Sequence, residues 1–137
     1  MELSLKEIAF LEISHIPHIL ASADALKKGY VAYFVVLTIT ILLSIANHVP
    51  YLDNPKLDYL EKASTLITIT YTLVEFHNYI NYVDIALGIF CVILYYIAFF
   101  DYARQDSRYV SLHTLWHVLS GILLYSIILK ANKKQPG

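Results

Sequence analysis

Residues 109–129 read "YVSLHTLWHVLSGILLYSIIL", a run without Asp, Glu, Lys or Arg. About 20 mostly apolar residues are enough for one α-helix to cross the hydrocarbon core of a bilayer. His113 and His117 stand near the start of the run, four residues apart. Positions i and i+4 share one face of a helix, so both imidazoles can reach a single ion. The stretch therefore predicts a membrane helix with two candidate metal ligands at one end.

The composition of the whole chain favours the same class of protein. Of 137 residues, 58% are hydrophobic and 15% are charged, against roughly 45–50% and about 25% in soluble domains. A soluble chain of this length has too much surface to bury so much apolar material. The net charge of −1 gives no indication of nucleic-acid binding, and Cys91 is the only cysteine. An intrachain disulfide and a cysteine-based zinc site are therefore excluded.

Two further segments resemble residues 109–129 in their apolar character. Residues 30–49 contain no charged side chain, and residues 83–100 contain one acid near their start. Both satisfy the length requirement for a membrane helix. The first ten residues, "MELSLKEIAF", lack the basic region and the cleavage site of a signal peptide. We therefore expect the spans themselves to direct the chain to the membrane.

Two segments are less clear. In residues 57–75 the first turns carry Asp58, Glu61 and Lys62, and the middle alternates like a strand. We predict a helix here, because an open strand edge cannot be satisfied in lipid. Residues 8–26 contain the stretch "SHIPH" and several ionisable side chains. This segment either spans the membrane inside a bundle or lies in the interface as a kinked amphipathic helix.

These elements predict an all-α fold, an integral membrane helical bundle of four to five transmembrane helices. The links between them are short, so residues 1–137 form a single transmembrane domain of antiparallel neighbours. Lysines 27, 28, 130, 133 and 134 fall on one side of the membrane and outnumber the basic residues opposite. The positive-inside bias then predicts a multi-pass protein with a cytosolic C-terminus. The expected partner is the lipid bilayer, and no nucleic acid is expected.

Alternation of the spans brings distant polar residues to one membrane face. His48 ends segment 30–49, Asp58 begins segment 57–75, and His113 and His117 begin segment 109–129. Ser44 lies one helical turn deeper than His48 on the same face. Three imidazoles and a water form a known open zinc site, and a nearby carboxylate can orient or deprotonate that water. We therefore predict Zn2+ held by His48, His113 and His117.

The combination of "S-x-x-x-H" at Ser44 and His48, an acid at Asp58 and "HTLWH" at residues 113–117 resembles a known superfamily. It is similar to the membrane hydrolases that include alkaline ceramidases, adiponectin-receptor-type, hemolysin III-type and myomaker-like proteins. The resemblance covers residues 14–76 and 105–130. It implies a zinc-dependent hydrolase acting on a lipid amide or ester, with Asp58 handling the attacking water and Ser44 beside the metal or the oxyanion. In the myomaker-like group it implies a role in membrane fusion instead.

The chain departs from that superfamily in helix number. The family has seven helices, whereas this chain has four or five, with one helix between the Asp58 helix and the "HTLWH" helix where the family has three. Because an even number of helices is missing, His48, Asp58 and the "HTLWH" motif still lie on the same side of the membrane. The wall of a lipid cavity is thinner, however, unless a second subunit completes it. A homo-oligomer is therefore one expectation. Glu61, one turn from Asp58, and Asp53 in the preceding loop are alternatives for the functional acid.

Three functions remain open from the sequence. The first is a zinc-dependent hydrolase with a lipid substrate. The second is a non-enzymatic, fusion-related or receptor-like membrane protein whose zinc is structural. In the third, the histidines are only interfacial side chains of a small bundle. A second metal site at His15 and His18 is the less favoured interpretation of "SHIPH", because a kink at Pro17 already accounts for that pattern.

Overall fold

The computed structural model describes residues 2–49 and 54–134, and every regular element in these ranges is helical. The fold class predicted from the sequence is confirmed to this extent, including a helix across the strand-like stretch of residues 57–75. Asp53 lies outside the described residues. The helices are α1 (Leu5–Ile13), α2 (Ile16–Lys27), α3 (Val31–Asn47), α4 (Pro55–Glu75), the short 3-10 helix η2 (His77–Tyr79), α5 (Tyr82–Ala103) and α6 (Arg108–Lys130).

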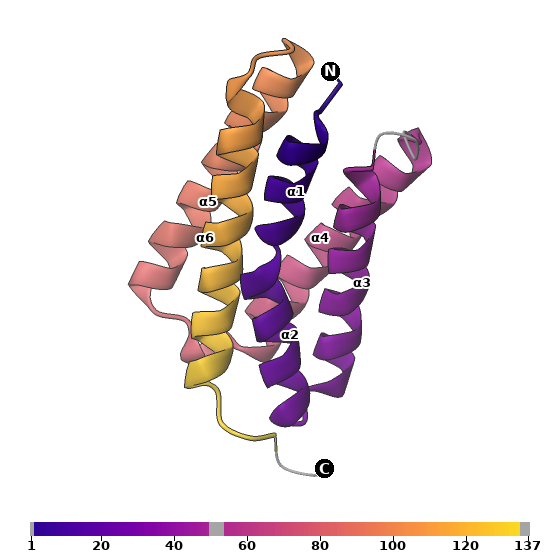
Figure 1. The fold of residues 1–137 in the computed structure, drawn as a ribbon. Coiled ribbons are helices and arrows are strands. Elements are labelled where there is room, and N and C mark those ends of the chain that lie inside the picture. Colours follow the sequence, from indigo (N-terminus) through magenta and orange to yellow (C-terminus); the bar gives the residue numbers. More distant parts are fainter. Residues whose placement is uncertain (1, 50–53, 135–137) are drawn as a thin grey trace.

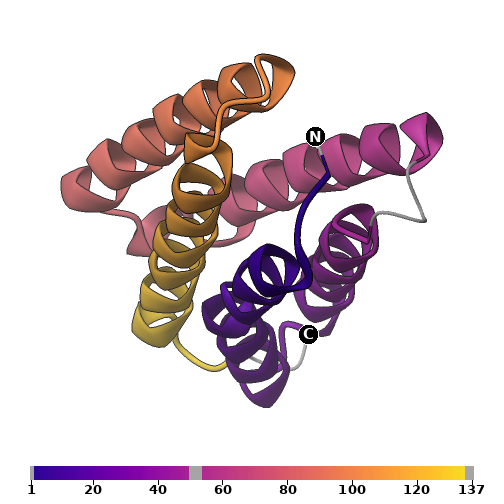
Figure 2. The ribbon, with the colours of Figure 1, turned by 45° about the horizontal axis from the view of Figure 1, so that its top comes forward.

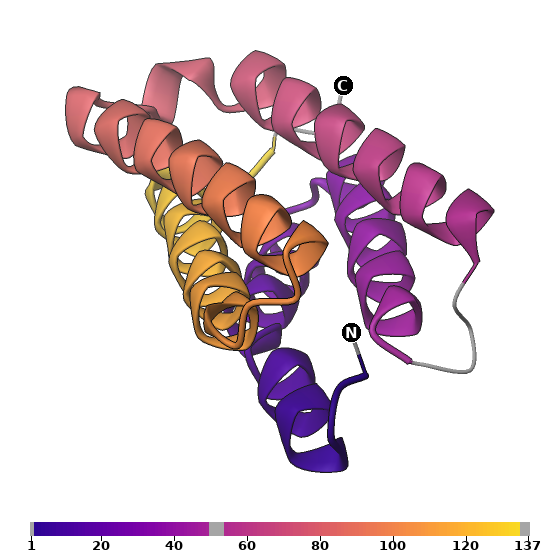
Figure 3. The same cartoon turned by 90° about the horizontal axis from the view of Figure 1, so that it is seen from above.

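Two helical hairpins flank the N-terminal segment. Helices α3 and α4 pack together on one side, and α5 and α6 pack together on the other. Between the hairpins, α2 packs on both α3 and α6, and α1 packs on α6 (Figure 1). Seen from above, α1 and α2 close one side of the space between the hairpins, and α4 and α5 lie on the opposite side (Figures 2 and 3).

Helices α1 and α2 together cover the length that the sequence assigned to one segment. Ser4 starts α1 with a capping box, in which the backbone N–H of Glu7 donates to the Ser4 hydroxyl and the backbone N–H of Ser4 donates to the Glu7 carboxylate. The Ser4 hydroxyl also donates to the Glu7 carboxylate. These hydrogen bonds hold the pKa of Glu7 below its usual range. The helix is interrupted at Ser14 and His15, and Pro17 lies in the first turn of α2. Proline has no N–H to donate, so the hydrogen-bond ladder of α1 cannot continue through it.

The apolar core occupies the half of the bundle near the α2–α3 turn. There Tyr33 and Phe76 are fully buried, with their ring centroids 4.9 Å apart. Hydroxyl pairs join the helices above them, including Tyr33 with Thr72 (2.9 Å) and Thr40 with Thr68 (2.8 Å). Such pairs are typical of helix contacts that have no water available. His48, His113 and His117 lie toward the other end of the bundle.

In the part of the chain that the structure describes, two helices are long and apolar enough to cross a membrane, namely α5 and α6, and 22% of the apolar window of each is buried inside the protein. Large apolar side chains such as Ile89 and Ile93 point outward from α5. The core helix of a soluble protein would be mostly buried instead. The predicted four to five spans are not confirmed, because α3 has only 17 residues and α4 carries Asp58, Glu61 and Lys62 in its first two turns.

Candidate metal centre

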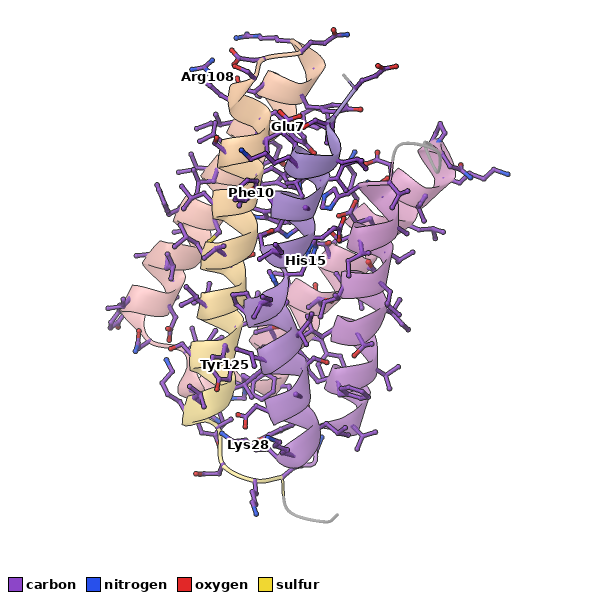
Figure 4. All side chains as sticks on the ribbon, in the orientation of Figure 1. Glu7, Phe10, His15, Lys28, Arg108 and Tyr125 are labelled. Atoms are coloured by element: carbon purple, nitrogen blue, oxygen red, sulfur yellow. The ribbon has the colours of Figure 1, made fainter. Side chains whose placement is uncertain are left out.

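The histidines meet because the end of α3, the first half of α6 and the break between α1 and α2 come together inside the bundle. His48 caps the C-terminus of α3, and His113 and His117 occupy successive turns near the start of α6. The ends of α3 and α5 and the starts of α4 and α6 all lie at one end of the molecule (Figure 1). This arrangement agrees with the alternation expected from the sequence. His15 joins them from the break between α1 and α2, midway along the bundle (Figure 4).

One nitrogen from each of His15, His48 and His117 lies within 4.8 Å of the other two. The three side chains are buried, with exposed fractions of 1%, 7% and 2%. The ring centroids are 4.1 Å apart for His15 and His117, and 5.4 Å apart for His48 and His117. Such spacing suits imidazoles that converge on one ion after small rotations of the rings.

His113 lies beside this trio. Its Nε2 atom is 3.3 Å from Nε2 of His48. Two nitrogens that share a tetrahedral zinc, with bonds of about 2.0–2.1 Å, lie roughly 3.4 Å apart. The same distance also suits a hydrogen bond between two neutral imidazoles, so His113 serves either as a ligand or as a neighbour of the ligands. The predicted set of His48, His113 and His117 stays a prediction, with His15 added by the fold.

The unsatisfied atoms of the cluster fit a metal. Among the described residues, Nε2 of His15 and Nε2 of His117 are buried and have no hydrogen-bond partner, and the same holds for Oγ of Ser44. An unsatisfied buried polar atom costs about 1–3 kcal/mol. Neutral imidazole nitrogens are common ligands of zinc, and binding one ion would satisfy both nitrogens together. These donor atoms therefore fit the zinc ion that the resemblance to the membrane hydrolases implies.

The acid predicted from the sequence does not point toward the histidines. The side chain of Asp58 is 46% exposed, and its carboxylate pairs with Lys62 one turn later at 2.6 Å. Its other hydrogen bond comes from the amide of Asn47 at 3.4 Å. Glu61, the alternative acid, accepts a closer hydrogen bond from Asn47 and lies near enough to His48 for their charges to interact. The structure therefore favours Glu61 over Asp58 as the acid from α4.

Sequence reasoning did not assign Glu12 and His15 to the site. Oε1 of Glu12 lies 3.2 Å from Nδ1 of His48, although the two residues are far apart in the chain. His18, which contributes to the same motif, forms a hydrogen bond with Ser120 on α6 instead (3.1 Å). The sequence feature that indicates these two residues is their three-residue spacing just before Pro17. Their contact with His48 could be recognised only once the path of residues 8–26 in the fold was known.

Comparison of the chain with known protein families, with curated proteins and with solved structures returned no match. The functional interpretation of the histidine cluster therefore rests on its own geometry and chemistry.

Proposed function

We propose that this protein is an integral membrane protein that binds one zinc ion through His15, His48 and His117 and uses it to hydrolyse a lipid amide or ester. The convergence of three buried imidazole nitrogens within 4.8 Å carries the proposal. Intramembrane ionisable side chains are costly to keep in a protein, and a cluster of them therefore points to a function.

The membrane part of the proposal includes α3 and α4 as further spans beside α5 and α6. Outward-facing apolar side chains cover α4 as well as α5, and Leu66, Ile67 and Leu73 are each more than half exposed. In water such a surface would favour aggregation, whereas lipid tails satisfy it. The excess of lysine at residues 27–28 and 130–134 supports a cytosolic C-terminus.

The charge balance of the cluster also supports a divalent cation. Zinc bound by three neutral imidazoles would leave two positive charges in a region of low dielectric, which is unfavourable without compensation. The carboxylates of Glu12 and Glu61 both lie beside His48. Two carboxylates and one divalent ion together give a locally neutral site.

Zinc bound at this position would supply Lewis-acid chemistry, by polarising a carbonyl group and activating water. The chain's own groups have separate tasks. Glu61 is positioned to hold or accept a proton at the mouth of the bundle, while Asn47 orients its carboxylate. Ser44 presents a buried hydroxyl that has no hydrogen-bond partner within residues 2–49 and 54–134, which suits donation to a developing oxyanion.

A nearby apolar groove supports a lipid as the substrate. The groove lies between α2 and α3, has a volume of about 450 Å³, and includes Ile19, Phe34 and Leu42 in its lining. Its lining also includes Ile45, which lies three residues before His48 on α3. An acyl chain in this groove would run along the bundle, with its carbonyl end near the level of the histidines.

A structural zinc is the second candidate, and the position of His113 favours it. With His15, His48 and His117, this residue would bring the number of imidazoles to four. Four protein ligands close the tetrahedral shell and leave no position for a substrate. In that case the ion would join α3, α6 and the α1–α2 break, and would stabilise the bundle without turnover.

Metal analysis of the protein purified in detergent tests the first step. We expect about one zinc per chain, and less than ~0.2 after His15→Ala, His48→Ala or His117→Ala. His77→Ala is the matched control, because His77 is exposed and lies in η2, beyond the end of α4 that is far from Asp58 and Glu61. Wild-type protein with less than ~0.2 zinc per chain, unchanged in these variants, would contradict the proposal.

Release of fatty acid from lipid amides and esters separates the two candidates. A hydrolase should lose turnover in Glu61→Gln while it keeps its zinc. A structural site predicts no turnover in the wild type, but a large loss of thermal stability when a chelator removes the metal.

A further inference from the structure

The hydrogen bond between Glu12 and His48 determines which nitrogen of His48 is available. An ionised carboxylate has no proton to donate, so Nδ1 of His48 must donate to Oε1 of Glu12 across 3.2 Å. In a neutral imidazole the other nitrogen, Nε2, then carries the free lone pair. Nε2 is also the atom that faces His113 at 3.3 Å. The Glu12 carboxylate therefore directs the metal-binding lone pair of His48 into the cluster.

His15 shows the same arrangement with a backbone acceptor. Its Nδ1 lies 3.0 Å from the carbonyl oxygen of Leu11, and its buried Nε2 has no hydrogen-bond partner in the described part of the chain. The carbonyl can only accept, so Nδ1 carries the proton and Nε2 carries the lone pair. Both acceptors, the Glu12 carboxylate and the Leu11 carbonyl, are neighbours on α1. One short helix therefore holds two of the three candidate ligands in the tautomer that a metal needs.

We propose that Glu12 is a positioning residue for this centre, through its hydrogen bond to Nδ1 of His48; the assignment rests on the zinc site proposed above. A carboxylate on the far nitrogen of a metal-bound histidine fixes the orientation of the ring and raises its basicity. Loss of such a contact typically weakens metal binding 10–100-fold. Helix α1 is thus a working part of the metal centre as well as a packing element.

The geometry favours this role over direct coordination by Glu12. Its Oε1 is engaged by His48, whereas its Oε2 has no hydrogen-bond partner among the described residues. This Oε2 lies 4.0 Å from Nδ1 of His15, the nitrogen that already donates to Leu11. Both carboxylate oxygens therefore face the protonated sides of the two rings. In each ring Nε2 lies on the side away from the Nδ1 that faces Glu12, so the carboxylate leaves both lone pairs free for an ion.

Two measurements test the assignment, one on metal-free protein and one on metal binding. The ¹⁵N shifts of the histidine rings in metal-free protein report the tautomer of His48. We expect the Nδ1–H form in the wild type, and a mixture of tautomers in Glu12→Ala. Zinc affinity, measured by competition with a chelator, should fall 10–100-fold in Glu12→Ala. The zinc affinity of Glu12→Gln should fall less, because the neutral amide oxygen accepts the same hydrogen bond from His48 without carrying a charge.

Glu2→Gln is the matched control, since it removes one carboxylate from the exposed N-terminal end of the same segment. It should leave both readouts unchanged. The Co²⁺-substituted protein should show the same coordination number in the wild type and in Glu12→Gln. Should Glu12→Ala fail to fold, Glu12→Gln alone decides, because it keeps nearly the same volume.

Two results would overturn the positioning role. In the first, the zinc affinity of the Glu12 variants stays within twofold of the wild-type value and the ¹⁵N shifts still report the Nδ1–H tautomer of His48. In the second, the Co²⁺ spectrum shows one ligand fewer in Glu12→Gln, which would make Glu12 a ligand. Failure of the zinc proposal looks different, because the wild type itself would then bind no zinc, whatever residue occupies position 12.

Discussion

Substitution of Gly121 by alanine should separate α2 from α6 at the level of the metal centre. A Cβ atom at this position would lie 2.7 Å from Cβ of Pro17 and 2.8 Å from Nδ1 of His18. It would also lie 3.0 Å from the backbone nitrogen of His18. A backbone atom and a proline ring cannot turn aside as a flexible side chain would. The first turn of α2 must therefore move as a unit.

The size of the effect follows from these distances. Carbon atoms in ordinary contact lie about 3.5–4.0 Å apart, so the start of α2 must shift by roughly 1 Å. Overpacking of this kind costs about 1–3 kcal/mol, and the better helix propensity of alanine recovers up to ~1 kcal/mol. His15 precedes this turn and moves with it, away from His117. Metal-ligand distances tolerate only about 0.2 Å, so zinc affinity should fall at least ~10-fold.

Gly88 on α5 provides the matched control for this experiment. The nearest atom to a Cβ there is Cδ2 of Leu123 at 3.7 Å, an ordinary contact. Gly88→Ala should therefore stabilise the protein by up to ~1 kcal/mol. Reversible unfolding in mixed micelles, followed by circular dichroism, should place the two variants about 2 kcal/mol apart. Equal stability of the two variants, with zinc affinity of Gly121→Ala within twofold of the wild type, would refute the reasoning.

Further predictions concern the helix ends and the ions. Lys28→Met should lower the free energy of unfolding by about 2 kcal/mol in the same assay, because the ammonium group of Lys28 donates to three carbonyls at the end of α6. The control Lys27→Met, at an exposed neighbouring lysine, should be nearly neutral. Asp58→Asn should change stability by less than ~1 kcal/mol, because the ion pair of Asp58 with Lys62 is half-exposed. Zinc content should stay unchanged, and loss of zinc would show that the Asp58 carboxylate faces the histidines after all. Double substitution of His48 and His117 should cost little more zinc affinity than either single change; additive losses would argue against one shared ion.

Much of the fold follows from local features of the chain. Long apolar runs without charge predict helices, and alternation along the chain predicts that His48 and the His113–His117 pair meet at one end. The 3.6-residue period places His113 and His117 on one face without any tertiary information. The helices and the shared face depend on neighbours within a few turns, and the meeting of the histidines follows from the alternating direction of successive helices, so a single sequence was enough to predict them.

Other features depend on how the helices rotate and approach one another. Asp58 and Glu61 share a face of α4 in the sequence, yet Lys62 draws the first outward while Asn47 of α3 holds the second near the cluster. The number of spans also stayed unresolved, because hydropathy sets a minimum length but does not reveal what covers a short or charged helix.

What the sequence by itself determined is the helical class, the apolar surface and the pairing of residues one turn apart. Only the tertiary structure decided that the break before Pro17 brings His15 and Glu12 against His48 and His117. The reason is physical: periodicity along a helix is a property of the backbone, whereas the distance between helices depends on side-chain volume at each crossing. At Gly121 the absence of a Cβ lets α2 approach α6, and this approach keeps His15 close to His117 in the proposed zinc site.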